Sequence, residues 1–195
     1  MKGFKILWGG FVILLLAGAP VSAAWAVLPA FPLSHPDSKD VIDNGAFPVA
    51  LADNLMIDSI VVHKWAHEML VFRKGMLLKK YVVQLGSNPV GPKQYLGDHK
   101  TPEGTYYISG KNAASRFHKS LGISYPNAED LQKASSQGKS PGGDIMIHGL
   151  PNGEENVGPT RYRNDWTWGC IAVRNAEIDE LFEHTEPGTP IVITP

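Results

Sequence analysis

The 195-residue chain carries 18 basic and 19 acidic residues, a net charge of −1 with neutral histidines. It has no basic stripe of the kind that binds nucleic acid, so no nucleic-acid partner is expected. Its single cysteine excludes an internal disulfide framework and a cysteine-rich metal site.

The first 23 residues have the pattern of an export signal. Two lysines precede an apolar run from Ile6 to Ala19, and small residues precede a cleavage point after Ala23. The run is shorter than the roughly 20 residues that cross a bilayer. Apolar character resumes over residues 25–28, however, so an uncleaved membrane anchor is the alternative. We therefore expect an exported protein of the periplasm or cell envelope, which contacts a membrane only if the leader is retained.

The remainder of the chain divides into a lead-in and one domain. Residues 24–54 are rich in Pro, Ala, Ser and Asp without a sustained period, which is typical of a linker or a loosely packed lead-in. Residues 55–195 are expected to form a single mainly β domain, with mixed sheets and two short peripheral helices. Strands rich in Ile and Val or bounded by turns are predicted at residues 57–63, 67–72, 77–85, 105–109, 144–148 and 189–194. The first three should form an antiparallel meander.

Both helices have recognisable ends. Asn127 can cap a helix over Ala128–Gln137 that stops at Gly138. Asn175 is the predicted cap of the second helix, which places three apolar residues on one face, Ile178, Leu181 and Phe182.

Cys170 and His148 are the candidate nucleophile and base. His148 ends a predicted strand 22 positions before the thiol and is followed by Gly149. A thiol beside an imidazole can give up its proton and attack a carbonyl, and the imidazole is expected to lower the thiol pKa and form an ion pair. The alternatives are a small buried cysteine without chemistry and a core histidine bonded to the backbone.

The residues around Cys170 suggest supporting roles. Gly169 would let a substrate carbonyl approach the backbone, and the amides of Gly169 and Cys170 could stabilise an oxyanion. If residues 170–174 are extended, Arg174 shares a face with Cys170 and could bind a carboxylate.

A 21-residue loop separates His148 from Cys170. Loops of this length in compact domains are usually functional or disordered, so this one could be a lid. Arg161, Arg163 and Asp165 would give it charges for an anionic substrate, and a solvated loop face is the alternative. His63 and His67 are four positions apart but lack the pattern of a metalloprotease helix, so they are expected to face solvent and no metal site is predicted.

Taken together, these residues resemble the L,D-transpeptidase catalytic domain, the YkuD-type family of bacterial cell-wall enzymes. The resemblance covers about residues 55–195. It rests on His148-Gly149 and Thr167-Trp168-Gly169-Cys170, and on three further segments at residues 91–93, 97–104 and 123–127.

The resemblance implies a cysteine acyltransferase that needs no cofactor and acts on peptidoglycan stem peptides. In this family the thiol attacks the bond between diaminopimelate and the terminal D-alanine of a tetrapeptide stem. The acyl-enzyme is then resolved by an amine of a second stem, by another amine such as a lipoprotein lysine, or by water. Cys170 would be the nucleophile and His148 the base. Gly169, Gly149 and Thr167 would be supporting residues, and Arg174, Arg161, Arg163 and Tyr125 are candidates for substrate binding.

Two departures from the usual pattern leave transfer and hydrolysis both open. Trp168 stands where the family commonly has histidine, and Ala172 where many members have arginine, with Arg174 two positions further on. The alternatives are an L,D-carboxypeptidase or amidase that hydrolyses such links, and a noncatalytic wall-binding protein on the same fold.

Overall fold

The computed structural model describes residues 50–154 and 164–195, which lie in one compact unit that runs from Asn44 to Pro195. The predicted leader, most of the lead-in and the lid residues Arg161 and Arg163 are outside the described residues. None of the helices in the described part of the chain is long and apolar enough to cross a membrane.

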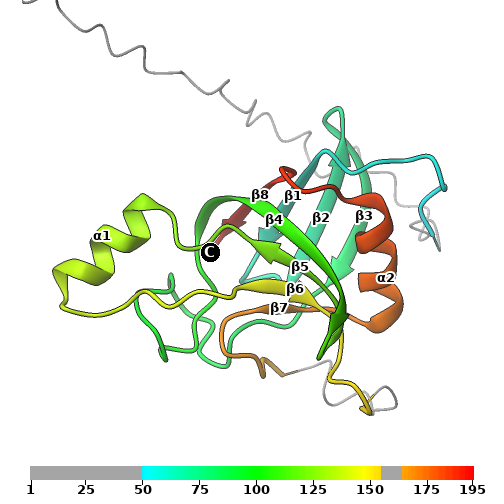
Figure 1. Ribbon diagram of the computed structural model, residues 1–195. Coiled ribbons are helices and arrows are strands. Elements are labelled where there is room, and N and C mark those ends of the chain that lie inside the picture. Colours follow the sequence, from blue (N-terminus) through cyan, green and yellow to red (C-terminus); the bar gives the residue numbers. More distant parts are fainter. Residues whose placement is uncertain (1–49, 155–163) are drawn as a thin grey trace, which may run out of the picture. The chain divides into compact units, whose positions relative to one another are not determined.

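Within these residues, eight strands form one sheet in the order β3-β2-β1-β8-β4-β5-β6-β7 (Figure 1). The strands are β1 (Ser59–His63), β2 (Glu68–Arg73), β3 (Met76–Val82), β4 (Gly104–Ser115), β5 (His118–Ile123), β6 (Met146–His148), β7 (Ile171–Ala172) and β8 (Pro190–Thr194). Neighbouring strands are antiparallel except for the pairs β1–β8 and β6–β7, which are parallel. The predicted mainly β fold with mixed pairing and an N-terminal meander is confirmed.

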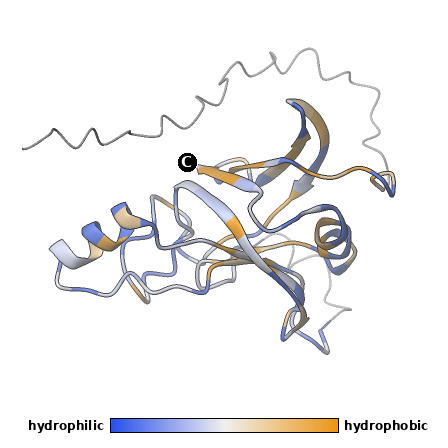
Figure 2. Cartoon of the chain, turned by 45° about the horizontal axis from the view of Figure 1, so that its top comes forward, coloured by the Kyte–Doolittle hydropathy of each residue, from blue (hydrophilic) through white to orange (hydrophobic). Residues whose placement is uncertain are grey.

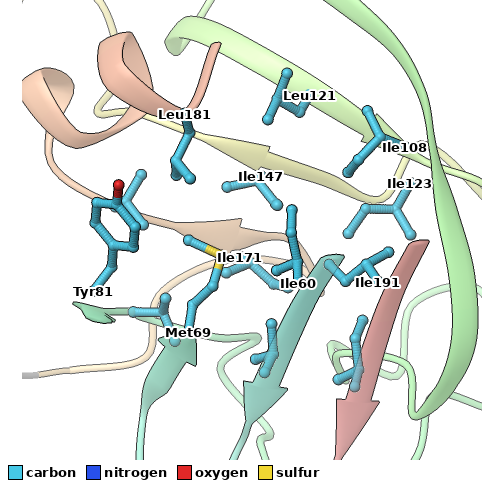
Figure 3. Packing of buried hydrophobic residues seen from close by; sticks show 14 of the residues in the cluster. Ile60, Met69, Tyr81, Ile108, Leu121, Ile123, Ile147, Ile171, Leu181 and Ile191 are labelled. Atoms are coloured by element: carbon cyan, nitrogen blue, oxygen red, sulfur yellow. The ribbon is translucent and has the colours of Figure 1, made fainter. Parts of the chain in front are cut away.

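The sheet curls around its core because β4 belongs to both halves. This 12-residue strand pairs with β8 through its first residues and with β5 through the rest, with register shifts that bend it. Figure 3 shows side chains from the two halves pointing toward one another. Ile60 and Ile191 come from one half, and Ile147 and Ile171 from the other. All four are essentially inaccessible to solvent, as expected for the face that drives folding.

The helices flank the sheet, as predicted. α1 (Ala128–Ser136) begins at Asn127, whose side chain accepts from the backbone N–H groups of Glu129 and Asp130. α2 (Asn175–His184) packs on β5 and β6 and contributes Leu181 to the core. Figure 2 shows both hydrophilic and hydrophobic colours along the helices, and the hydrophobic colour of β8 beside the C-terminus.

Four details differ from the sequence prediction. β5 was not predicted, and β4 extends well beyond the expected residues 105–109. The cap of α2 is Arg174 rather than Asn175, which is the first helical residue. Leu51, near the end of the predicted lead-in, is buried and its N–H donates to the Glu180 carboxylate of α2.

Candidate active site

His148 ends β6, and Cys170 directly precedes β7, the strand that pairs with β6. β6 and β7 are parallel, and their register pairs His148 with Ala172. If the backbone is also extended at Cys170, its side chain projects to the face of Ala172 and His148, because side chains alternate along a strand. The pairing of the predicted nucleophile with its predicted base stays a prediction, which this placement at the end of the sheet supports.

The His148 imidazole is oriented by a backbone carbonyl. Its Nδ1 lies 2.7 Å from the Gly149 oxygen, and a carbonyl can only accept, so Nδ1 carries the hydrogen. In the neutral ring, Nε2 then keeps its lone pair and can act as a base. Burial lowers the pKa of His148, against the opposing effect of the Gly149 hydrogen bond. A neutral, correctly oriented imidazole is therefore the resting form.

Two aromatic rings enclose this imidazole. The Phe117 ring centroid is 4.5 Å from that of His148, and the Trp166 ring meets it edge-on at 5.7 Å. Only 3% of His148 is exposed. These contacts restrict the ring to one rotamer and exclude water from most of it.

The surroundings of the Cys170 thiol disfavour its ionised form. Burial raises the pKa of Cys170, and the nearby Asp144 charge adds to the rise, although a Met146 backbone hydrogen bond and the Lys93 charge oppose it. Sγ donates to the Asp144 carbonyl at 3.5 Å. The direction of this shift is opposite to the lowering of the thiol pKa that an adjacent imidazole could produce. Desolvation favours the uncharged forms of both groups over an ion pair.

Thr167 organises the turn that carries the thiol. Its buried hydroxyl donates to the Cys170 carbonyl at 2.7 Å and accepts the Gly169 N–H at 3.1 Å. Since the Gly169 N–H is already donated, the expectation that this amide faces an oxyanion does not fit this turn. The backbone N–H of Cys170 is the remaining candidate of the two.

Gly169 is required by its backbone and its neighbour. It adopts φ of +128°, and a Cβ there would lie 2.6 Å from the Lys100 carbonyl oxygen. The space beside the thiol is therefore filled by the loop before β4. Only glycine combines this φ with so close an approach.

That loop is itself fixed by a buried ion pair. Lys93 Nζ lies 2.8 Å from Asp98 Oδ1, and both side chains are 3% exposed. Asp98 also accepts the backbone N–H groups of Gln94, Tyr95 and Lys100. Burial alone would raise the pKa of Asp98, but these hydrogen bonds and the Lys93 ammonium hold it below its usual range.

The sequence of this domain was compared with models of known protein families. A model of the L,D-transpeptidase catalytic domain (YkuD) matches residues 57–193. The chain belongs to this family. It is also 34% identical over 109 residues to YafK of Escherichia coli strain K12, whose name describes it provisionally as an L,D-transpeptidase. That match covers 55% of this chain and 37% of YafK, so the chain spans little more than a third of this curated relative.

A solved structure confirms the L,D-transpeptidase fold. The helical cell shape determining protein Pgp2 from Campylobacter jejuni superposes with a TM-score of 0.53 and 24% identity. The overlap covers 72% of this chain and 48% of Pgp2.

A cavity of about 550 Å³ lies on the same face of this L,D-transpeptidase domain. Gly110 and Gly122, paired across β4 and β5, leave part of its floor without side chains. Asp144 and Met146, which contact the Cys170 sulfur, form one side. Cys170 and His148 are not among the lining residues, so the cavity adjoins the thiol through Asp144 and Met146. Its lining consists of Ser109, Gly110, Lys111, Asn112, Ser120, Gly122, Ile123, Ser124, Tyr125, Asp144, Ile145 and Met146.

The other predicted substrate-binding residues are dispersed. Tyr125 lines the cavity but is 5% exposed, and its hydroxyl donates to the Pro141 carbonyl at 3.0 Å. Arg174 is exposed at the start of α2, where its N–H donates to the Glu177 carboxylate at 2.8 Å. Its contact with a substrate carboxylate stays a prediction, as do the roles of Arg161 and Arg163.

Asp165 and the paired histidines have structural partners. Asp165 accepts from Leu85 N–H at 2.7 Å and lies 3.0 Å from His67 Nε2, so it ties the end of the loop to the domain. His63 Nδ1 lies 2.9 Å from Thr194 Oγ1. Both histidines are partly exposed to solvent, as expected for this hairpin, and each also has a hydrogen-bonding partner. Within residues 50–154 and 164–195, no group of three or more potential ligands could hold a metal ion.

Sequence reasoning missed Phe117 and the full role of Asn175. Phe117 packs on the imidazole, and its position just before β5 became recognisable only with that strand. Asn175 Oδ1 accepts the Leu150 N–H at 2.8 Å, which fixes the residues after His148. An asparagine at the first turn of a helix gave no signal of this contact across the fold.

Proposed function

We propose that this protein is a cysteine acyltransferase that acts on peptidoglycan stem peptides in the cell envelope. The proposal is carried by the orientation of His148, whose Nδ1 is bound to the Gly149 carbonyl, together with the position of Cys170 directly before β7, the strand that pairs with β6. Membership of the L,D-transpeptidase family supplies the substrate class.

The two neutral groups define how attack begins. As Sγ of Cys170 approaches the diaminopimelate carbonyl, its proton moves to His148 Nε2, and a carbon–sulfur bond forms. Proton transfer is thus coupled to attack, because burial disfavours a thiolate waiting in the free enzyme. The tetrahedral oxyanion would be held by backbone N–H groups, with that of Cys170 as the first candidate.

Collapse of this intermediate breaks the bond to D-alanine. The imidazolium returns its proton to the leaving amine, and a thioester remains on Cys170. His148 then accepts a proton from the second nucleophile. An amine of another stem or of a lipoprotein gives transfer, whereas water gives the hydrolytic alternative.

The test is to incubate the domain lacking residues 1–23 with a disaccharide-tetrapeptide and to follow products by mass spectrometry. A thioester adduct on Cys170 and release of D-alanine are expected. Cross-linked dimers would establish transfer, and tripeptide alone would establish hydrolysis. Cys170→Ala is the control, and product formation that survives this substitution would refute the mechanism. The absence of any adduct or product would favour the noncatalytic wall-binding reading.

A further inference from the structure

A stacked pair of rings stands beside the thiol. Trp168, two residues before Cys170, is 78% exposed. Its indole is 5° from parallel with the His99 imidazole, and the ring centroids are 5.6 Å apart. The mechanism proposed above uses neither ring. An indole this exposed, close in sequence to the candidate nucleophile, could bind a ligand that has a flat apolar face.

The ring pair is mounted on rigid backbone. On either side of Trp168 the chain is held by the Thr167 hydrogen bonds and by the contact of Gly169 with Lys100. The His99 carbonyl accepts the Asn88 N–H at 3.1 Å. Little conformational entropy is therefore lost when a ligand binds to the exposed indole.

Polar groups adjoin the rings. Ser87 Oγ lies 3.2 Å from His99 Nδ1, and Ser87 and Asn88 are both exposed. A flat aromatic face beside hydroxyl and amide groups matches a pyranose ring, which has one face of C–H bonds and a rim of hydroxyl and acetamido groups. We propose that Trp168 and His99 form a binding site for a sugar of the glycan strand that bears the stem peptide. This inference rests on the proposed function for the identity of the strand.

The dimensions of the substrate agree with this placement. Three stem residues separate the sugar from the attacked bond, and an extended chain spans at most about 3.6 Å per residue. The sugar then lies within roughly 11 Å of the attacked carbonyl. The Cα atoms of Trp168 and Cys170 are at most about 7 Å apart by the same measure, and the indole extends outward from there. One sugar can therefore stack on Trp168 while the stem reaches the thiol.

The binding experiment uses the full chain carrying Cys170→Ala, so that no turnover occurs. The probe is the peptide-free disaccharide of N-acetylglucosamine and N-acetylmuramic acid, and the indole N–H signals are followed by nuclear magnetic resonance. Saturable movement of the Trp168 signal is expected, with the Trp65 signal unmoved. Trp65 is the matched control because it is 81% exposed and lies in the turn between β1 and β2.

Substitutions provide a second readout. Trp168→Ala should weaken disaccharide binding about tenfold or more, and Trp65→Ala should not. With the intact thiol, Trp168→Ala should lower the ratio of kcat/KM for disaccharide-tetrapeptide to kcat/KM for free tetrapeptide. Circular dichroism checks that each variant is folded. The indole signals of the protein that carries only Cys170→Ala give a binding readout that does not require either tryptophan substitution.

Three results would overturn the proposal. The first is a Trp168 indole signal that does not move when the disaccharide is added. The second is an equal movement of the Trp65 signal. The third is a Trp168 signal that moves only with free stem peptide or phospholipid vesicles. A failure of the proposed acyl transfer can be distinguished from a failure of the sugar site, because the binding experiment requires no reaction. Saccharide binding without turnover would leave this site intact and remove the proposed acyl transfer, and turnover without saccharide binding would do the reverse.

Discussion

The Asn175 side chain occupies the space that a Cβ on Gly149 would need. A Cβ at residue 149 would lie 2.6 Å from Asn175 Oδ1, the same atom that accepts the Leu150 N–H. Since the Gly149 carbonyl holds His148 Nδ1, the fit between α2 and the end of β6 determines how the imidazole is oriented.

Gly149→Ala is expected to disturb the base. The added methyl group must displace Asn175 or the Gly149 carbonyl, which should cost about 1–3 kcal/mol of unfolding free energy. A displacement of about 1 Å at the imidazole can reduce the rate up to a hundredfold. Urea unfolding and the rate of thioester formation measure the two effects. Gly143→Ala is the control, because nothing lies within 4 Å of a Cβ there. Equal rates of thioester formation in the two variants would show that the fit between Gly149 and Asn175 does not determine the orientation of His148.

Asn175 is expected to affect the reaction by positioning the residues after His148 rather than by contacting the substrate. Asn175→Ala removes the acceptor for Leu150 N–H and should lower kcat with little change in KM, since the acceptor lies behind the imidazole rather than on the cavity wall. Asn175→Asp keeps an acceptor oxygen and should recover most of the rate. If both variants lost activity equally together with their near-ultraviolet circular dichroism, a purely structural role would be indicated instead.

Thr167 should be replaceable only by another hydroxyl. Thr167→Val has nearly the same shape but loses the bonds to Gly169 and Cys170, and should destabilise the fold by about 1–3 kcal/mol. Thr167→Ser retains both bonds and should stay close to the wild type. Thermal unfolding together with single-turnover acylation tests this, and a fully active Val variant would contradict the importance of the turn.

The expected pH dependence follows from the directions in which the pKa values of His148 and Cys170 are shifted. The base must be neutral, and burial lowers the pKa of His148 from its ordinary value of 6.5, so the acid limb of kcat/KM should lie below pH 6.5. Burial raises the pKa of the Cys170 thiol above its ordinary 9.0. Alkylation of the free enzyme by iodoacetamide should therefore accelerate with pH beyond that value. Alkylation that is already fast and constant at neutral pH would reveal a preformed ion pair.

The Lys93–Asp98 pair should stabilise the loop under the thiol. Asp98→Asn leaves the Lys93 ammonium buried without its charge partner, which should cost about 3–5 kcal/mol. The folded-state pKa of Asp98 is lowered, so its contribution is complete above the unfolded-state pKa and is lost as pH falls through the folded-state pKa. Urea titrations at neutral and strongly acidic pH should show that the variant lacks this acid-sensitive part. Glu129→Gln, at an exposed helix pair with Lys133, should change stability little and serves as the control.

The sequence was informative where local chemistry dominates. The apolar run that ends at His148 predicts a buried strand with a polar residue at its mouth, and the structure has that arrangement. Asn127 followed by Glu129 and Asp130 predicts a helix start, and both backbone N–H groups bond to the asparagine. These features depend on residues close together in the chain, which is why a single sequence can reveal them.

Long-range partners could not be predicted in this way. β5 contains Lys119, Ser120 and Gly122, which have low strand propensity, and it forms because β4 and β6 pair with it on both sides. The charge of Asp165 suggested a substrate contact, but Leu85 and His67 lie beside it only after folding. The direction of the thiol pKa shift likewise depends on burial, which the neighbouring residue types do not reveal.

The position of β8 has a consequence for how the chain folds. This strand pairs with β1 on one side and β4 on the other, so the last strand of the chain lies inside the half of the sheet that contains the first strand. Strands from opposite ends of the described chain must meet before the core can close, and such distant pairing slows folding. The thiol would stay accessible to oxidants during this interval. A folding assay under mild peroxide should therefore oxidise Cys170 far more readily than the same treatment applied after folding is complete.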